Sequence, residues 1–374
     1  MNPQFWRDKK VLVTGHTGFK GSWLSLWLQD MGASVCGYSL PPPTQPSLFE
    51  IAHVADGMSS EDGDVRDFEK LRTCVAKFQP EIIFHLAAQS LVRYSYAHPI
   101  ETYTTNVIGT VNLLEAVRQS PSARAVVNVT SDKCYENREL HRGYHEGDPM
   151  GGHDPYSSSK GCAELVTAAY RDSYFGAASC AVPAVALASA RAGNVIGGGD
   201  WAEDRLIPDI IRAISAGQPA AIRNPGAVRP WQHVLEPLAG YLILAERLLD
   251  GGSEFAEGWN FGPAQEDAKP VSWIADHLVQ CWGGTAQWQR DGLAHPPEAT
   301  LLQLDAAKAR SRLAWHPQFG LREAISWTVE WYKAYSDHED MRGFSMTQIS
   351  RYLERLRDGM GKACADATSG EILT

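Results

Sequence analysis

Short apolar runs alternate with amphipathic stretches along the first half of the chain, and this rhythm is the feature that most restricts its fold. The apolar runs predict strands at 10–15, 33–39, 81–88, 123–131 and 182–190, and helical periodicity predicts helices at 18–32, 67–78, 99–119 and 154–175. Strands that are apolar on both faces lie inside a sheet that helices cover on both sides. Their alternation with helices predicts a parallel sheet of βαβ units, and therefore a doubly wound α/β fold of the Rossmann type.

The second half loses this rhythm. A Gly-rich loop at 193–204 is followed by predicted helices near 206–216, 271–281, 305–313, 320–336 and 344–358. We expect residues 1–190 to form the Rossmann domain, with 231–262 returning to it, and most of 191–374 to form a smaller mixed α/β lobe that binds the substrate. The prolines of 39–50 predict a loop, and the polar tail after Lys362 is expected to fray.

A glycine motif lies between the first predicted strand and the first predicted helix. The stretch "TGHTGFKG" places Gly15, Gly18 and Gly21 at three-residue spacing. Glycines let the backbone turn sharply and approach a pyrophosphate, which the free N–H groups of the helix then bind. A purely structural turn is the alternative, but the strand before and the helix after favour dinucleotide binding.

The choice between NAD and NADP depends on the region after the second strand. An acidic residue about 20 residues beyond the glycines usually binds the ribose hydroxyls of NAD. Here that region has Ser39 and no acid, and it also has no arginine or lysine for a 2′-phosphate; Lys20 is the nearby cation. NAD is therefore favoured. Asp64 follows a short strand, where it could accept from the adenine amino group or, alternatively, cap the helix at 67–78.

Polar side chains follow the apolar run at 123–131, in the stretch "TSDKCY". Ser131, Asp132 and Lys133 stand in consecutive positions, and Tyr156 and Lys160 lie four residues apart on the next predicted helix. That spacing places the phenol and the amine on one helix face. A nearby ammonium lowers the pKa of a phenol from about 10, so that the phenol can take a proton from a substrate hydroxyl.

Composition and charge exclude several other classes of function. The net charge of −10 argues against nucleic-acid binding, and the seven cysteines form no CxxC pair and no metal spacing. His141, His145 and His153 lie near one another without a zinc motif. There is no apolar signal core before the first strand and no stretch long enough to span a membrane. We expect a cytoplasmic protein that holds no metal.

The four stretches "TGHTGFKG", "HLAAQS", "TSDKCY" and "YSSSK", in this order, resemble the extended short-chain dehydrogenase/reductase superfamily over nearly the whole chain. The resemblance implies that Ser131 hydrogen-bonds the substrate oxygen, that Tyr156 is the base and that Lys160 grips the nicotinamide ribose. Asn106 matches a position used mainly for architecture. The residues expected to bind NAD are Gly15, His16, Gly18, Phe19, Lys20, Gly21, Asp64, Val65, Leu86, Ala87, Gln89, Tyr156 and Lys160.

The pair Asp132–Lys133 resembles the sugar-nucleotide 4,6-dehydratases, in which an acid and a second proton-transfer residue follow the strand-tip hydroxyl. With "GHTGFKGSWL", "RAGNVIGGGDW" and "VRPWQHVLEPL", it is similar to the members that act on CDP-glucose. This implies that C4 is oxidised, that Lys133 removes the C5 proton and Asp132 protonates the departing C6 hydroxyl, and that hydride returns to C6. Lys133 must be neutral to act as the base, and an ordinary surface ion pair is the alternative for both residues.

The nucleotide sugar brings a second pyrophosphate, for which arginine is suited because its planar fork binds phosphate oxygens bidentately. The resemblance implies that Arg229 reaches the phosphates, and each arginine has a solvated-surface alternative. Backbone groups of 204–211 are expected to read the cytosine. The residues expected to bind the substrate are Ser90, Tyr94, Asn194, Trp201, Arg205, Arg223 and Arg229.

Taken with the resemblance, the sequence predicts a hydro-lyase that converts CDP-D-glucose to CDP-4-dehydro-6-deoxy-D-glucose and serves deoxysugar synthesis for O-antigen or other surface polysaccharide. The alternatives are a 4,6-dehydratase or 4-epimerase of another nucleotide sugar, and a non-catalytic binding protein. The superfamily usually dimerises through the Tyr helix and the long helix at 99–119, so we expect a homodimer or a dimer of dimers.

Overall fold

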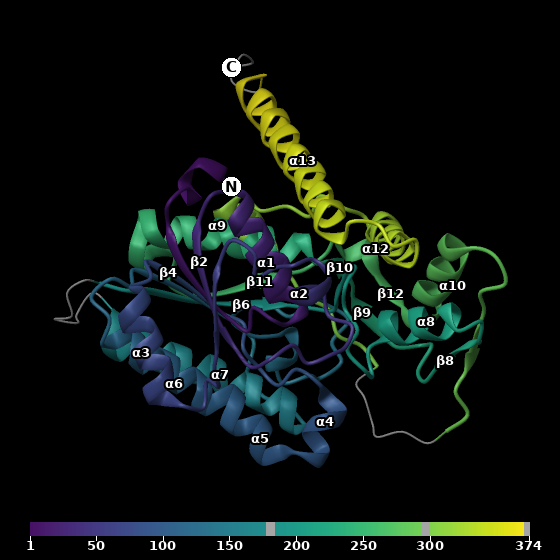
Figure 1. The fold of residues 1–374 in the computed structure, drawn as a ribbon, viewed down its shortest axis with the longest axis horizontal. Helices are drawn as coiled ribbons and strands as arrows, with labels where there is room; N and C mark the ends of the chain where they lie inside the picture. Colours follow the sequence, from purple (N-terminus) through teal and green to yellow (C-terminus); the bar gives the residue numbers. More distant parts are fainter. Residues whose placement is uncertain (177–183, 294–299, 370–374) are drawn as a thin grey trace.

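Seven parallel strands form the central sheet, in the order β11–β6–β5–β4–β1–β2–β3 (Figure 1). The structure is a computed structural model that describes residues 1–176, 184–293 and 300–369, with side chains described as far as residue 358. The predicted doubly wound parallel sheet is confirmed. The strands of the sheet are β1 (Lys10–Thr14), β2 (Ser34–Ser39), β3 (Ser59–Asp62), β4 (Ile82–His85), β5 (Ala125–Val129), β6 (Ala186–Ala192) and β11 (Gly258–Phe261).

Helices cover both faces of this sheet (Figure 1). Along β1, Val11 and Val13 pack into the cluster that contains α1 and α9, whereas Leu12 packs into the cluster that contains α3 and α6. This alternation explains why the strand is apolar throughout. The helices of the sheet domain are α1 (Phe19–Asp30), α2 (Leu48–Ile51), α3 (Phe68–Phe78), α4 (Val92–Ala97), α5 (Pro99–Tyr103), α6 (Gly109–Arg118), α7 (Pro155–Tyr170) and α9 (Leu235–Gly251).

Shorter helical turns complete the sheet domain. The long helix predicted at 99–119 is α5 and α6 joined by a π turn, η2 (Thr104–Ile108), and the helix predicted at 154–175 is α7 followed by a second π turn, η4 (Arg171–Phe175). The other short turns are η1 (Pro3–Trp6), η3 (Asp132–Cys134), η5 (Gly252–Phe255) and η6 (Gln265–Asp267).

Most of the remaining elements form the second lobe, seen to the right of the sheet in Figure 1, whereas α13 rises above the sheet. Two-stranded sheets pair β9 with β12 and β8 with β13, and β7 pairs with β10. The remaining elements are β7 (Val195–Ile196), α8 (Leu206–Ser215), β8 (Ala220–Ile222), β9 (Val228–Pro230), β10 (Gln232–His233), β12 (Ala268–Pro270), α10 (Val271–Trp282), β13 (Trp288–Arg290), α11 (Ala307–Leu313), α12 (Leu321–Ser336) and α13 (Met341–Ser369).

Three sequence predictions differ from the structure. The strand predicted at 182–190 begins at Ala186, and its first residues, 182–183, lie outside the described residues. The predicted loop at 39–50 runs into the short helix α2, which Ser47 caps through its hydroxyl. The prediction of a frayed tail after Lys362 is wrong as far as Ser369, because α13 continues to that residue.

The order of the strands in the sheet predicts where a ligand binds. From β1 the strand order runs one way to β2 and β3, and the other way through β4 and β5 to β6 and β11. Ligands of such sheets bind beyond the carboxyl ends of the strands, where the order reverses. In this sheet that place lies beyond the ends of β1, β4 and β5. No helix among the described residues is long and apolar enough to cross a membrane.

Candidate active site

A large cleft lies between the sheet domain and the second lobe. Its volume is about 1760 Å³, which exceeds the roughly 300–1,000 Å³ of a site for one small molecule. Every residue predicted to bind or react lines it, with one exception, His16. Those that line it are Gly15, Gly18, Phe19, Lys20, Gly21, Asp64, Val65, Leu86, Ala87, Gln89, Ser90, Tyr94, Ser131, Asp132, Lys133, Tyr156, Lys160, Asn194, Trp201, Arg205, Arg223 and Arg229.

The glycine motif leaves no room for side chains. Gly15 has a φ of +76°, and a Cβ there would lie 2.6 Å from the backbone nitrogen of Ala87. A Cβ on Gly21 would lie 2.1 Å from the carbonyl oxygen of Gly15. Helix α1 begins directly after Gly18, so its first N–H groups face the cleft. This cradle fits the pyrophosphate of a dinucleotide.

His16 lies behind this cradle rather than in the cleft. Its Nε2 is 2.7 Å from the hydroxyl of Ser60, and its ring fills the space that a side chain at Gly37 would need. Burial lowers the pKa of His16 to about 4, so the ring is neutral at physiological pH. The ring therefore packs the glycine turn against β2 and does not reach a ligand in the cleft.

Hydroxyls and one carboxylate mark the end of the cleft beyond β2. Thr17 Oγ1 lies 2.8 Å from Ser39 Oγ and donates to the carbonyl of Leu40 at 2.9 Å. The carboxylate of Asp64 accepts three side-chain hydrogen bonds from Arg66, at 2.5, 2.8 and 3.0 Å. The alternative that Asp64 caps the next helix is wrong, because Asp67 is the N-cap of α3.

Asn106 joins three parts of the site from within the π turn. Its Nδ2 donates to the carbonyl of Gln89 at 2.9 Å and to the hydroxyl of Ser159 at 2.8 Å, and its Oδ1 accepts from the backbone of Gln89. A π turn inside a helix often marks a functional site. Asn106 thus fixes the segment after β4 against α7, in agreement with its expected architectural role.

The three consecutive polar residues stand where β5 ends. Ser131 Oγ donates to Asp132 Oδ1 at 3.0 Å and accepts from the backbone of Lys133 at 3.2 Å. Asp132 is 3% exposed, and its Oδ2 has no hydrogen-bond partner among the described residues. Burial raises the pKa of this carboxyl, although Lys133 and Arg229 oppose the shift. A raised pKa favours the protonated carboxyl, which is the form that protonation of a leaving hydroxyl requires.

Tyr156 and Lys160 project from the first turns of α7 toward this strand tip. Burial raises the pKa of Tyr156 to about 12, while a hydrogen bond with Ser131 and the charge of Arg205 oppose the shift. Burial lowers the pKa of Lys160 to about 8. In the free protein, burial therefore outweighs the hydrogen bond and the charge of Arg205, and the phenol is protonated, contrary to our expectation that a nearby ammonium lowers its pKa.

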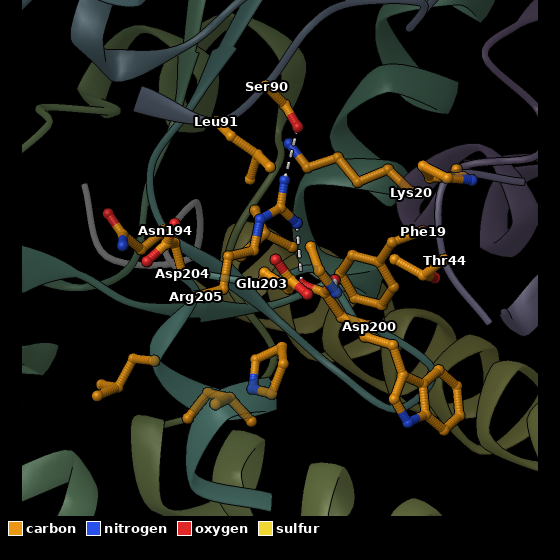
Figure 2. A pocket seen from close by; sticks show the side chains of 18 of the residues that line it. Phe19, Lys20, Thr44, Ser90, Leu91, Asn194, Asp200, Glu203, Asp204 and Arg205 are labelled. Carbon is orange, nitrogen blue, oxygen red and sulfur yellow. Dashed lines mark hydrogen bonds and ion pairs between the residues drawn. The ribbon is translucent and has the colours of Figure 1, made fainter. Parts of the chain in front are cut away.

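Lys20 extends from α1 into the same part of the cleft (Figure 2). Its Nζ lies 3.5 Å from the hydroxyl of Tyr241, a fully buried residue of α9. Burial lowers the pKa of Lys20 to about 7, and the charges of Arg205 and Lys160 add to the shift. Asp132 opposes it.

Arg205 spans the cleft, as Figure 2 shows. Its guanidinium donates to Asp200 Oδ2 at 2.9 Å and to the hydroxyl of Ser90 at 2.9 Å. Asp200 belongs to the Gly-rich loop, and Ser90 belongs to the segment after β4. Arg205 thus ties the two walls of the cleft together.

A second set of ion pairs crosses the cleft nearby. Arg223 and Arg93 both donate to Asp204 Oδ1, at 2.9 and 2.8 Å. The structure therefore places Arg223 in the cleft, as predicted, but pairs it with a carboxylate of the same wall. Arg229 is 6% exposed and donates to the carbonyl of Val228 at 2.9 Å.

The aromatic and amide residues that were predicted to bind the substrate also line the cleft. Trp201 packs edge-on against Trp331 and Tyr332, with ring centroids 5.5 Å from each. Tyr94 donates its hydroxyl to Glu101 at 2.7 Å. Asn194 lines the cleft from the start of the Gly-rich loop.

Sequence reasoning missed Arg93, Asp200 and Asp204. A signal was present for two of them, since Asp200 and Asp204 belong to the loop "GGGDWAED" just before the arginine that was predicted. Arg93 carried no signal of its own, because its partner is 111 residues away in the chain.

Comparisons with known proteins agree with this geometry. A family model described as GDP-mannose 4,6 dehydratase matches residues 12–254. The chain is 59% identical over 353 residues to a CDP-glucose 4,6-dehydratase of Salmonella typhimurium, which covers 94% of this chain and 98% of the relative.

Two solved structures share the fold. A dTDP-glucose 4,6-dehydratase of Bacillus anthracis in complex with NAD has a TM-score of 0.72, at 23% identity, covering 88% of this chain and 98% of that one. A UDP-glucose 4-epimerase of Thermotoga maritima with UDP-glucose has a TM-score of 0.75, at 20% identity, covering 87% and 99%.

The parallel sheet, the glycine cradle and the Ser–Tyr–Lys arrangement define a member of the extended short-chain dehydrogenase/reductase class. Within that class, the chain belongs to the GDP-mannose 4,6 dehydratase family, whose model spans more than half of its length.

Proposed function

We propose that this protein is a hydro-lyase that converts CDP-D-glucose to CDP-4-dehydro-6-deoxy-D-glucose and water. The observation that carries the proposal is Asp132, a buried carboxyl with a raised pKa and an oxygen left for a ligand, placed beside Ser131 at the tip of β5. An oxidation followed by reduction at one carbon needs no such acid, whereas loss of water does. The identity of 59% to a CDP-glucose 4,6-dehydratase supports the substrate.

NAD is the cofactor that the cleft would hold, with Gly15, Gly18 and Gly21 around its pyrophosphate and Lys160 at its ribose. The glycine cradle fits the group, and a dehydratase with the same fold was solved with NAD. When bound, NAD accepts hydride from C4 of the sugar and later returns hydride to C6.

The residues at the strand tip move the protons. In its phenolate form, Tyr156 takes the proton of the C4 hydroxyl, and Ser131 holds that oxygen by a hydrogen bond. The ketone at C4 makes the C5 hydrogen acidic, and we assign its removal to Lys133, which lines the cleft next to the acid. Asp132 gives its proton to the C6 hydroxyl, which leaves as water. Lys133 then returns its proton to C5 once C6 has been reduced.

The arginines of the second lobe are the groups that would bind the diphosphate. Arg229 and Arg223 line the cleft on the side of the second lobe, and Arg205 lines it too and interacts electrostatically with Tyr156. Two phosphate charges suit this cluster in a protein whose net charge is −10.

An assay with four nucleotide sugars tests the proposal. The protein is incubated with CDP-, dTDP-, UDP- and GDP-glucose, and 4-keto sugar is measured by its absorbance in alkali, with Tyr156→Phe as the inactive control. We expect product from CDP-glucose first. Keto sugar from another nucleotide alone would overturn the assigned substrate, and conversion of glucose to galactose without water loss would establish an epimerase.

We also propose a homodimer that forms through α5, α6 and α7. This face exposes large apolar side chains, among them Ile100 (80%), Leu165 (63%) and Ile108 (48%). Exposed apolar patches commonly mark protein–protein interfaces, in which a partner covers them. Light scattering should give twice the chain mass, and Ile100→Lys with Leu165→Lys should reduce it to one chain; a monomeric parent protein would refute the proposal.

We also propose the cellular compartment of the protein and the pathway that its product enters. The described cysteines (Cys36, Cys74, Cys134, Cys162 and Cys281) are all free thiols, which supports a reducing cytoplasm. A 4-keto-6-deoxy sugar nucleotide is an activated precursor, so we place the product in deoxysugar synthesis for surface polysaccharide.

A further inference from the structure

A buried carboxylate on α7 lies behind the active site and takes no part in the reaction described above. Glu164 follows Lys160 by one helical turn and is 5% exposed. Its Oε2 accepts from Arg191 Nη2 at 2.6 Å and from Ser189 Oγ at 2.6 Å, and its Oε1 accepts from Thr130 Oγ1. Burying an ionised carboxylate is expensive unless it is paired and hydrogen-bonded, so this arrangement calls for an explanation.

The network continues away from the cleft and anchors the pair. Arg191 Nη1 donates to the hydroxyl of Tyr135 at 2.7 Å, and that hydroxyl donates to Asn260 Oδ1 at 2.7 Å. These residues come from β6, from the segment after η3 and from β11, so the carboxylate is held from several sides. Burial alone would raise the pKa of Glu164, but Arg191 and the hydroxyls hold it below its usual value, and Glu164 is charged at neutral pH.

Two features connect this charge to catalysis. Thr130 immediately precedes Ser131, so the hydrogen bond to Glu164 fixes the strand tip that carries the reacting groups. Residues four apart on a helix share a face, so Glu164 and Lys160 lie on the same face of α7. Burial lowers the pKa of Lys160, and Glu164 is the first of the charges that oppose that shift.

The other titratable groups that interact with Lys160 do not supply a negative charge in place of the Glu164 carboxylate. Cys134, from η3, also favours the protonated amine, but burial keeps that thiol neutral by raising its pKa. Lys20, from α1, and His85, from β4, each face Lys160, and neither carries a negative charge. Glu164 is therefore the carboxylate that offsets the burial of this amine.

We propose that Glu164 is a positioning residue: its carboxylate keeps the Lys160 amine protonated and holds the strand tip at Thr130, so that the Tyr156 phenolate forms beside a cation. The inference rests on the proposed function only for the roles of Tyr156 and Lys160. An uncharged Lys160 could not stabilise the phenolate.

The protonation of Lys160 can be measured without substrate or cofactor. Protein that contains lysine labelled with ¹³C at Cε is titrated by NMR, and Lys160→Arg identifies the Lys160 signal. In Glu164→Gln, the proton affinity of Lys160 should fall roughly tenfold or more, which is the effect of losing an opposite charge within ~4–6 Å. The control is Glu115→Gln, which breaks an exposed Glu–Arg pair on α6 and should leave the Lys160 signal unchanged.

A second variant separates charge from folding. Glu164→Gln leaves Arg191 buried without its partner, whereas Glu164→Gln with Arg191→Met leaves no unpaired charge. We expect the titration midpoint of the double variant to lie between those of Glu164→Gln and the parent. If Glu164→Gln does not fold, the double variant alone tests the proposal. A Lys160 titration midpoint of the double variant at or above that of the parent overturns the proposal.

The pH dependence of CDP-glucose turnover is a further measurement. A purely structural role of Glu164 would leave this pH dependence unchanged. Because the protonated amine is the active form, the alkaline limb of the pH–rate profile should shift to lower pH in Glu164→Gln. A folded variant with lower activity but an unshifted limb and an unshifted Lys160 titration would refute the proposal. Absence of CDP-glucose turnover in the parent would instead refute the proposed function and leave the NMR result valid.

Discussion

Replacing Lys20 by methionine should stabilise the free protein at neutral and mildly acidic pH. The pKa of Lys20 falls from its usual 10.5 to about 7 because the amine is buried near Arg205 and Lys160. The folded chain thus binds fewer protons than the unfolded chain between these values, and its stability declines as the pH falls through this window. Methionine has a similar length and no charge, so it removes this penalty.

The structure sets the size of the effect. A shift of this size corresponds to at most ~5 kcal/mol, at about 1.4 kcal/mol for each pKa unit. Lys20 also lines the open cleft, where water screens its charge, so we take roughly half of that value. The hydrogen bond to Tyr241 is long, at 3.5 Å, and losing it should cost no more than about 1 kcal/mol. The expected net gain is about 1–2 kcal/mol.

Urea unfolding followed by tryptophan fluorescence tests this prediction. The gain of Lys20→Met over the parent should be largest below about pH 7 and should nearly vanish near pH 10. The matched control is Lys77→Met, whose side chain is 77% exposed and should give no pH-dependent gain. Equal stability of Lys20→Met and the parent at both pH values, or a gain that grows with pH, would refute the reasoning.

Three further outcomes follow from the same geometry. Asp132→Asn should slow water loss at least 100-fold, an effect typical of losing a general acid, while NAD binding measured by calorimetry stays unchanged; unchanged elimination would exclude this acid. Lys133→Met should abolish exchange of the C5 hydrogen with deuterated solvent, and full exchange would exclude this base. Burial raises the pKa of Glu236 from 4.5 to about 7, so its contribution to stability is present below about pH 4.5 and lost as the pH rises through about 7. Glu236→Gln should therefore gain about 3 kcal/mol over the parent between these pH values in urea unfolding; a pH-independent difference would contradict this.

Local chemistry was predictable from the sequence because it depends on neighbours in the chain. The glycine cradle needs three glycines between a strand and a helix, and the reacting hydroxyl, acid and amine follow directly after one buried strand. The burial of Ser131 and Asp132 at the end of β5 followed from the apolar run before them. Burial at this strand tip raises the pKa of Asp132, as the role that the resemblance implies for it requires.

Pairings between distant residues were not predictable in this way. Arg223 was expected to be available for phosphate, but it pairs with Asp204, which Arg93 contacts from the opposite wall. The buried pair of Glu164 and Arg191 joins α7 to β6, and no local sequence pattern predicts this pair. His16 looked like part of the cradle by its position in the motif, yet its ring turns toward β2 because Gly37 leaves space for it.

Transfer of hydrogen within one sugar is the most direct test of the proposed chemistry. CDP-glucose that carries deuterium at C4 is converted by the protein with its bound NAD, and the product is analysed by NMR and mass spectrometry. We predict that the deuterium appears in the new methyl group at C6 without net consumption of added NAD. Deuterium that is lost to solvent, or found in free NADH formed mole for mole with product, would contradict the account.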